Sequence, residues 1–360
     1  MAYKNILELF NQREVLNYLQ NRRYPTLVGE TLFPEVKKQS LKFDDIRGAM
    51  KVPVVASIHA FDTEAEIGSR EAEKRTLELA LIKRKMQLKE EDIIALENPR
   101  NSAEQQYLMR EVYNDIDVLV QGVRARVEAM RMEALATGKI TIDENGLQGT
   151  IDYNVPLENQ EVLTGTDLWS DDNSDPIGDI LRWVNSMPVK PTRALTSNTV
   201  LLRLLTHPKL TVLSQTGQIG LMTLPELDAV MTSFGLPIIR TYDEVYRKQN
   251  PDGTYETIRY FPEDRFVMFG DGPLGQTIYG PTAEEIRLRR DPSIQTNMIG
   301  NILAMVYEEN LDPVSTWTKA VATAMPSFPT AGEVFQATVF QKNENPDDNG
   351  NPGDNGNPDD

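Results

Sequence analysis

One segment of this sequence requires a single element that is unusually long for a compact domain. A helix over residues 102–137 would run roughly 50 Å at about 1.5 Å per residue. Apolar residues recur across it at intervals of three or four, which places them on one face of an α-helix. No catalytic residue type interrupts this stripe, so we predict a spine helix whose apolar face is a folding core. The core residues are Leu108, Val112, Ile116, Leu119, Val123, Val127, Met130 and Ala134.

Both ends of this predicted helix carry termination signals. Ser102 and Gln105 suit a capping box at the start, and Gly138 suits the left-handed residue that follows a helix. Beyond it, apolar and polar residues alternate on both sides of Asn145-Gly146, a sequence typical of a type I′ turn. Residues 139–155 are therefore predicted to form a β-hairpin.

The composition excludes several classes of chemistry. The 360 residues include no cysteine, which excludes disulfides, thiolate metal sites and a cysteine nucleophile. Imidazole chemistry is nearly excluded as well, because the only histidines are His59 and His207. No apolar run approaches the ~18 residues of a membrane span, and no signal peptide is recognisable at the start. We therefore expect a globular protein that is made in the cytosol and does not enter a membrane.

The negative charge is divided between the body and the C-terminal tail. The tail after Lys342 holds six acids and no base, so the remaining chain carries −11 of the net charge of −17. Nucleic acid is held by clustered Lys and Arg, which release counterions from phosphates. An acidic body of this kind is expected to repel DNA. The tail, residues 342–360, repeats Asn-, Pro- and Asp-rich hexamers without a hydrophobic side chain and is predicted to be disordered.

The rest of the chain divides into segments of different character. Residues 4–22 are predicted to form an N-terminal helix. Residues 41–89 are predicted to form a long two-stranded β-ribbon with a polar tip, which we call the excursion. Such a ribbon is only marginally stable alone and would gain stability by packing on another surface. Asp175 and Pro176 supply an N-cap and a first-turn proline for a second region of helices and antiparallel strands. A last strand at 334–340 is expected to join the sheet beside the spine helix.

Within the second region, turn signals separate several short elements. The sequence Asn250-Pro251-Asp252-Gly253 suits a turn between two strands. Helices are predicted at 177–187, 198–207 and 224–234, and strands at 237–246, 255–260 and 266–269.

The segment Gly270–Gly275 matches the G-x-G-x-x-G pattern of dinucleotide sites. That pattern should open a helix whose N-terminus faces a pyrophosphate. Here Pro273 and a strand-like segment follow, and Asp271 would repel phosphate. We interpret the segment as a glycine-rich turn.

The acidic loop Asp171–Asp175 begins like a calcium-binding loop but lacks its essential later positions. The sharp turn and the bidentate glutamate are replaced by Pro176 and Arg182. A capped loop is the better interpretation, and His207 before Pro208 suits a helix cap rather than a metal ligand. An acidic metal-dependent hydrolase with ligands from this loop is the alternative from a different class. We predict no catalytic, cofactor-binding or metal-binding residue.

The dense basic run is Lys83-Arg84-Lys85, which with Lys74, Arg75 and Lys89 makes the excursion basic in an acidic protein. One interpretation is an edge strand whose charges prevent aggregation. The other is charge complementarity with an acidic surface of a neighbouring copy.

Taken in order, several motifs resemble the lambda-type (E family) major capsid proteins of tailed bacteriophages. The similarity covers about residues 25–340, and the order and spacing of the motifs are more specific than any one of them. The motifs are Thr31–Val36, Ala134–Ile142, Ile151–Pro156, Phe234–Asp243, Ile278–Pro281 and Asp312–Val314.

The resemblance implies the α+β HK97-like capsid fold and a division of the chain into five parts. These are an N-terminal arm at 1–40, an extended β-hairpin loop at 41–89, a peripheral domain at 90–175 plus 291–341 around the spine helix, an axial domain at 176–290, and the tail.

The resemblance also implies a function and partners. The protein would be a structural subunit that assembles, in the host cytoplasm, as hexamers and pentamers of an icosahedral virion enclosing double-stranded DNA. A separate scaffolding protein, a portal and a decoration protein are the implied partners, and an encapsulin-like compartment shell is the alternative within the fold. The extended loop would lie across the adjacent subunit. Candidate intersubunit contacts are Arg70, Arg75, Lys83, Arg84 and Lys85.

Overall fold

The spine helix is present as α5 (Ser102–Thr137), at the residues predicted for it. Its C-terminal signal is confirmed, because Gly138 adopts the left-handed conformation with φ 71°. The N-terminal cap is one residue earlier than predicted: the Asn101 side chain accepts the N–H of Glu104, and Ser102 is already helical. All of the predicted core residues are buried except Leu108, which is half-buried against the same cluster.

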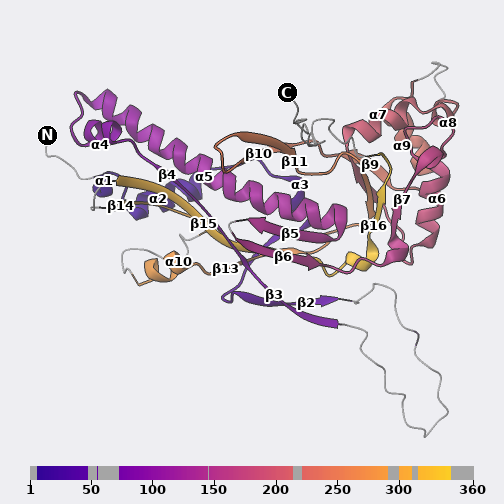
Figure 1. Cartoon of the computed structure of the whole chain (residues 1–360), viewed down its shortest axis with the longest axis horizontal. Coiled ribbons are helices and arrows are strands. Elements are labelled where there is room, and N and C mark those ends of the chain that lie inside the picture. The colour runs from indigo at the N-terminus through magenta and orange to yellow at the C-terminus, as the bar shows by residue number, and fades with distance from the viewer. Residues whose placement is uncertain are drawn as a thin grey trace, which may run out of the picture.

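The computed structural model describes residues 6–47, 55, 73–144, 146–213, 221–290, 300–309 and 315–341. Within these ranges the molecule is elongated along α5, with a group of shorter helices gathered at one end (Figure 1). This group consists of α6 (Pro176–Ser186), α7 (Asn198–Thr206), α8 (Pro208–Thr211) and α9 (Leu224–Ser233). The other short helices are α1 (Ile6–Leu9), α2 (Gln12–Asn21), α3 (Val28–Leu32), α4 (Glu90–Glu97) and α10 (Ala283–Leu288).

A five-stranded sheet, the spine sheet, lies against α5 (Figure 1). Its central strand is β15, which pairs with β4 along one edge and with β13 and β14 along the other. Alternate residues of β15, Ala320, Ala322 and Ala324, are fully buried in the same core as α5. The strands are β1 (Glu35–Lys37), β4 (Ala80–Gln87), β13 (Gln276–Gly280), β14 (Leu303–Glu309) and β15 (Ser315–Ser327).

A second five-stranded sheet, the distal sheet, packs against the helices α6–α9 at the end of the molecule where they gather (Figure 1). Its core stacks Trp183 between Trp169 and Phe335, with ring centroids 5.7 Å and 5.1 Å apart. The strands, in order across the sheet, are β7 (Gln160–Val162), β16 (Phe335–Thr338), β12 (Arg265–Phe269), β8 (Arg193–Thr196) and β9 (Ile238–Thr241).

Three two-stranded hairpins complete the described strands. Two of them confirm the predicted hairpin at 139–155 and the turn at 250–253, and Gly146 and Gly253 adopt positive φ. The third confirms the base of the predicted excursion, where Phe43 and Leu77 pair and are both buried. The hairpins are β2 (Lys42–Arg47) with β3 (Glu73–Glu78), β5 (Lys139–Glu144) with β6 (Leu147–Asp152), and β10 (Val245–Gln249) with β11 (Tyr255–Arg259).

Four expectations from the sequence need correction. The strand predicted at 237–246 is two strands, β9 in the distal sheet and β10 in a hairpin. Strands β8 and β9 pair in parallel, although antiparallel strands were expected in this region. The predicted N-terminal helix is two helices, because Asn11 interrupts it and caps α2 by accepting the N–H of Glu14. The strand expected at 334–340 does not join the sheet beside the spine helix. As β16 it pairs with β12 and β7 in the distal sheet, and the strand under the helix is β15. The division into arm, loop, peripheral and axial domains stays a prediction.

Candidate functional site

The buried centre of the spine helix is a charged cluster. Glu128 and Arg131 lie one turn apart on α5, and their side chains are 0% and 1% exposed. Their carboxylate and guanidinium atoms are 3.2 Å apart. Glu128 also accepts the backbone N–H of Gly29 at 2.7 Å and the hydroxyl of Tyr242 at 3.0 Å. One carboxylate therefore joins the N-terminal segment and the loop after β9 to the spine.

Arg131 extends this cluster into the spine sheet. Its Nε donates to Thr277 Oγ1 at 2.7 Å, and its Nη2 pairs with Glu35 at 3.1 Å. Glu35 in turn accepts hydrogen bonds from Tyr279 and Asn301. We call Gly29, Glu35, Glu128, Arg131, Tyr242 and Thr277 the spine node.

Electrostatics in the spine node follow from its burial. Burial raises the pKa of Glu128, although the Gly29 N–H and Arg131 both favour the charged form. The pKa of Tyr242 is raised by burial and by the Glu128 charge, so this hydroxyl remains a donor. Because the donors and acceptors satisfy one another, the arrangement positions segments and leaves no group poised for catalysis.

A second polar cluster attaches the N-terminal helices to the first half of α5. Buried Asp117 accepts the hydroxyls of Tyr18 at 2.8 Å and Tyr24 at 2.7 Å, and pairs with Arg22 at 2.8 Å. Burial and the hydrogen bond to Asp117 raise the pKa of Tyr18 to about 12. Asp117 thus fixes α2 and the segment after it along the spine.

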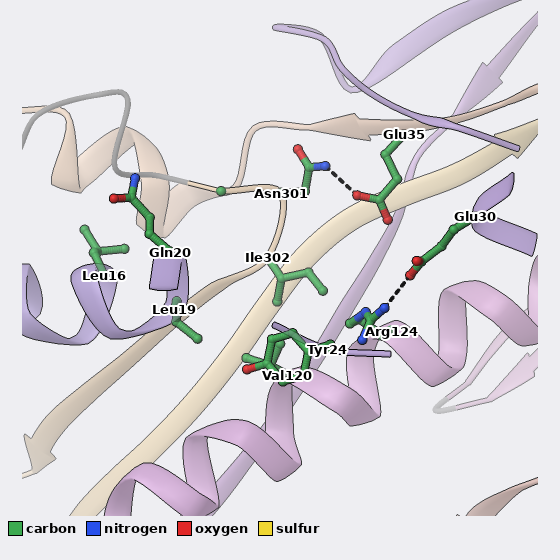
Figure 2. A pocket seen from close by; sticks show the side chains of 11 residues that line it. Leu16, Leu19, Gln20, Tyr24, Glu30, Glu35, Val120, Arg124, Asn301 and Ile302 are labelled. Atoms are coloured by element: carbon green, nitrogen blue, oxygen red, sulfur yellow. Dashed lines mark hydrogen bonds and ion pairs between the residues drawn. The ribbon is translucent and has the colours of Figure 1, made fainter. Parts of the chain in front are cut away.

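A cavity of about 480 Å³ lies between these two clusters, enclosed by α2, α5 and residues 300–302 (Figure 2). Its wall is apolar at Leu19 and Val120, and its polar side chains already have partners. Figure 2 shows Arg124 directed at Glu30, with 2.6 Å between their atoms. The cavity thus lies between packed structural segments, and the residues that line it do not form a set of convergent reactive groups.

The predicted contact residues occupy different environments. Arg70 lies outside the described residues. Arg75, on β3, donates to the carbonyl of Asp152 at 2.7 Å within the same chain. Lys83, Arg84 and Lys85 are consecutive and exposed on β4, and the pairing of β4 with β15 puts Arg84 on the opposite face from the two lysines.

The remaining sequence motifs have structural roles. Gly270–Gly275 is a turn between β12 and β13, as predicted, and no helix opens there. A Cβ on Gly275 would lie 1.9 Å from the Ser327 carbonyl oxygen, so close packing against β15 requires glycine. In the part of the chain that the structure describes, no cluster of His, Asp or Glu has metal-site geometry.

The acidic loop before α6 uses its side chains to hold local structure. Asp175 caps α6 by accepting the Gly178 N–H, as predicted, and Asp172 pairs with Arg203 at 2.6 Å. Buried His207 ends α7 and caps α8 by accepting the N–H of Lys209. These bonds favour the capped-loop interpretation over the alternative of a metal-dependent hydrolase.

The buried charges of the spine helix were not predicted from the sequence. The predicted core contains only apolar residues, whereas Asp117, Glu128 and Arg131 are also buried. The available signal was the spacing: Glu128 and Arg131 are three residues apart and flank the core residue Met130. Their partners come from distant segments, which a helical period does not reveal.

Comparison with known proteins gives a consistent result. The family model for phage major capsid protein E matches residues 11–339. A crystal structure described as a prophage capsid protein of Escherichia coli CFT073 is 16% identical, with a TM-score of 0.61, and covers 92% of this chain and 99% of that one. A phage-related protein of Bordetella bronchiseptica RB50 is 11% identical, with a TM-score of 0.54 over 91% and 96% of the two chains. No curated protein matches significantly in sequence.

None of the helices among the described residues is both long enough and apolar enough to span a membrane.

Proposed function

The chain belongs to the phage major capsid protein E family, and from this premise we propose that its copies assemble as hexamers and pentamers of an icosahedral shell. The family consists of structural capsid proteins, so the protein is a non-enzymatic capsid subunit with the HK97-like fold and a component of the virion. The family match over residues 11–339 is the observation that carries the proposal.

The architecture supports a role as a tile in a closed shell. Rings form through heterologous contacts, in which one surface of a subunit binds a different surface of the next. An elongated subunit with α5 along its length has such separate surfaces at its ends and edges (Figure 1). The spine node makes this tile stiff, because it ties the N-terminal segment, the spine sheet and the loop after β9 to one helix.

The predicted extended loop supplies a further part of the proposal. The β2–β3 hairpin projects from the spine sheet beside β5 and β6 (Figure 1). A two-stranded ribbon is marginally stable alone, so we place the extended loop across the adjacent subunit. The candidate contacts Arg70, Arg75, Lys83, Arg84 and Lys85 belong to this proposal.

Charge supports a DNA-filled interior. A net charge of −17 disfavours binding of phosphates, so packaged double-stranded DNA would slide along the wall. We place assembly in the host cytoplasm, with a scaffolding protein, a portal and a decoration protein as partners.

Expression with and without the neighbouring phage genes tests the proposal. We expect closed icosahedral particles by negative-stain electron microscopy when the partners are present. A protein that remains monomeric with every neighbouring gene would contradict it, and particles filled with an enzyme would favour an encapsulin-like compartment.

Replacing residues 62–75 by a short Gly-Ser turn tests the loop separately. We expect a folded protein, with unchanged helical circular dichroism, that no longer forms particles. Particles of normal size and yield would refute the role of the loop.

A further inference from the structure

The outer face of β4 is basic and, within the described part of the chain, exposed. Strand pairing sets Lys83 opposite Val321 and Lys85 opposite Lys319, on the face of the spine sheet turned away from α5. Arg84 alternates to the other face, where its side chain lies near Gly122 of α5 and donates to Gln249 at 3.1 Å. The basic run is therefore divided, and only Lys83 and Lys85 point outward.

The same strand forms an open edge. Among the described residues β4 pairs only with β15, so its other edge has no strand partner. Leu81, on the same face as Lys83, is 57% exposed. Within the described part of the chain, neither Lys83 nor Lys85 forms an ion pair with an acid.

An edge that only prevents aggregation carries solvated, mobile lysines. Lys85 differs from this, because its Nζ lies 3.7 Å from the centre of the Trp317 ring. A cation held on an aromatic ring, on the same strand face as an exposed leucine, makes a preformed surface for an acidic and partly apolar partner. We call Leu81, Lys83, Lys85 and Trp317 the β4 face.

The opposite charge occurs in excess on the same subunit. Glu90, Glu91 and Asp92 begin α4, which lies beside the first turns of α5 at one end of the molecule (Figure 1). Burial and the nearby charges of Glu111 and Asp92 raise the pKa of Asp115 on α5. In the described ranges none of the acids of this group has an ion-pair partner. We call the group the acidic end; its members are Glu90, Glu91, Asp92, Glu111 and Asp115.

We propose that the β4 face of one subunit docks the acidic end of a second copy. This inference rests on the proposed shell function and names the surfaces of one of its contacts. The two surfaces differ, so the contact is heterologous, as ring closure requires. Opposite charges steer the encounter and fix its register, while Leu81 and Trp317 supply apolar area.

Charge reversal and counter-reversal test the contact in the complete assembly system. Lys83→Glu with Lys85→Glu places like charges against the acidic end, and we expect roughly tenfold fewer particles by sedimentation and electron microscopy. Glu91→Lys with Glu111→Lys should cause a similar loss from the other side, since both positions are exposed. Combining all four substitutions should restore most of the particles.

A matched control separates this contact from net charge. Arg13→Glu with Lys139→Glu changes exposed residues by the same total charge, and should leave particle yield unchanged. Circular dichroism of the unassembled variants verifies folding. If the variant Lys83→Glu with Lys85→Glu fails to fold, the variant Glu91→Lys with Glu111→Lys repeats the test. The contact is refuted if folded reversed variants assemble normally, if the fourfold variant stays defective, or if the control fails equally. Absence of wild-type particles would instead contradict the shell function itself.

Discussion

The spine core and the distal core are built by different means. Around α5, buried charges and small alanines allow a helix to lie close to a sheet, with Glu128 and Arg131 at the centre. The distal core relies on large aromatic rings, with Trp169, Trp183 and Phe335 in stacked contact. The first core depends on directional bonds between distant segments, and the second on buried apolar area.

This difference indicates which of the two cores tolerates single substitutions and which does not. A buried hydrogen-bonded ion pair is costly to break, because removal of one partner leaves an unpaired charge. Aromatic packing responds more gradually to changes in size and shape. The spine core should therefore fail abruptly under single substitutions that the distal core would survive.

The largest effect is expected at Val123, which is 1% exposed on the face of α5 toward the spine sheet. Val123→Asp places an unpaired charge in the core and should destabilise the fold by more than about 4 kcal/mol. We expect loss of cooperative thermal unfolding. Val118→Asp is the control, because Val118 is on the same helix but 56% exposed, and it should unfold as the wild type does.

The next effect tests the spine node. Arg131→Ala leaves Glu128 buried without its cation and should cost about 3–5 kcal/mol, measured by denaturant unfolding. Arg110→Ala, on the exposed surface of the same helix, should change stability by less than about 0.5 kcal/mol. Equal losses of unfolding free energy in the two variants would show that Arg131 contributes no more to stability than an exposed residue of the same helix.

A smaller effect is expected in the distal core. Trp183→Phe keeps an aromatic ring but removes the indole N–H that donates to Glu161 at 2.6 Å. We expect a loss of about 1–3 kcal/mol in the free energy of unfolding. A loss equal to that of Arg131→Ala would remove the contrast between the two cores.

The smallest effect is a pH dependence at His207. Burial, with Arg203 and Lys209 nearby, lowers the pKa of this imidazole, although Asp172 and the Asp171 carbonyl oppose the shift. As the pH falls, the imidazole is therefore protonated in the unfolded chain before it is protonated in the folded one. The stabilising contribution of neutral His207 is thus complete above about pH 6.5 and declines below it. From about pH 7.5 to about pH 5.5, wild-type stability should fall more than that of His207→Asn. Parallel profiles of stability against pH in the two proteins would show that His207 is not the source of the pH dependence.

The parts of the fold predicted from sequence are those with strong local signals. The spine helix, the hairpin at 139–155 and the cap at Asp175 each combine a clear period with a turn or cap residue. Strand β15 was missed because the residues that approach the helix are alanines, which give a weak apolar alternation. Small side chains are what a close helix-to-sheet contact requires.

The candidate site was less predictable, because its bonds are nonlocal. The basic run Lys83–Lys85 is visible in the sequence, but its division between two faces depends on pairing with β15. Likewise, the partners of Glu128 are Gly29 and Tyr242, about 100 residues away in opposite directions. Periodicity identifies a helix face, whereas only the fold identifies what lies against it.

Cryo-electron microscopy of particles assembled from this protein and its neighbouring gene products tests the central claim most directly. We predict a closed icosahedral shell in which each tile has α5, the spine sheet and the distal sheet arranged as in Figure 1. Particles built from another protein, with this chain absent from the shell lattice, would contradict it.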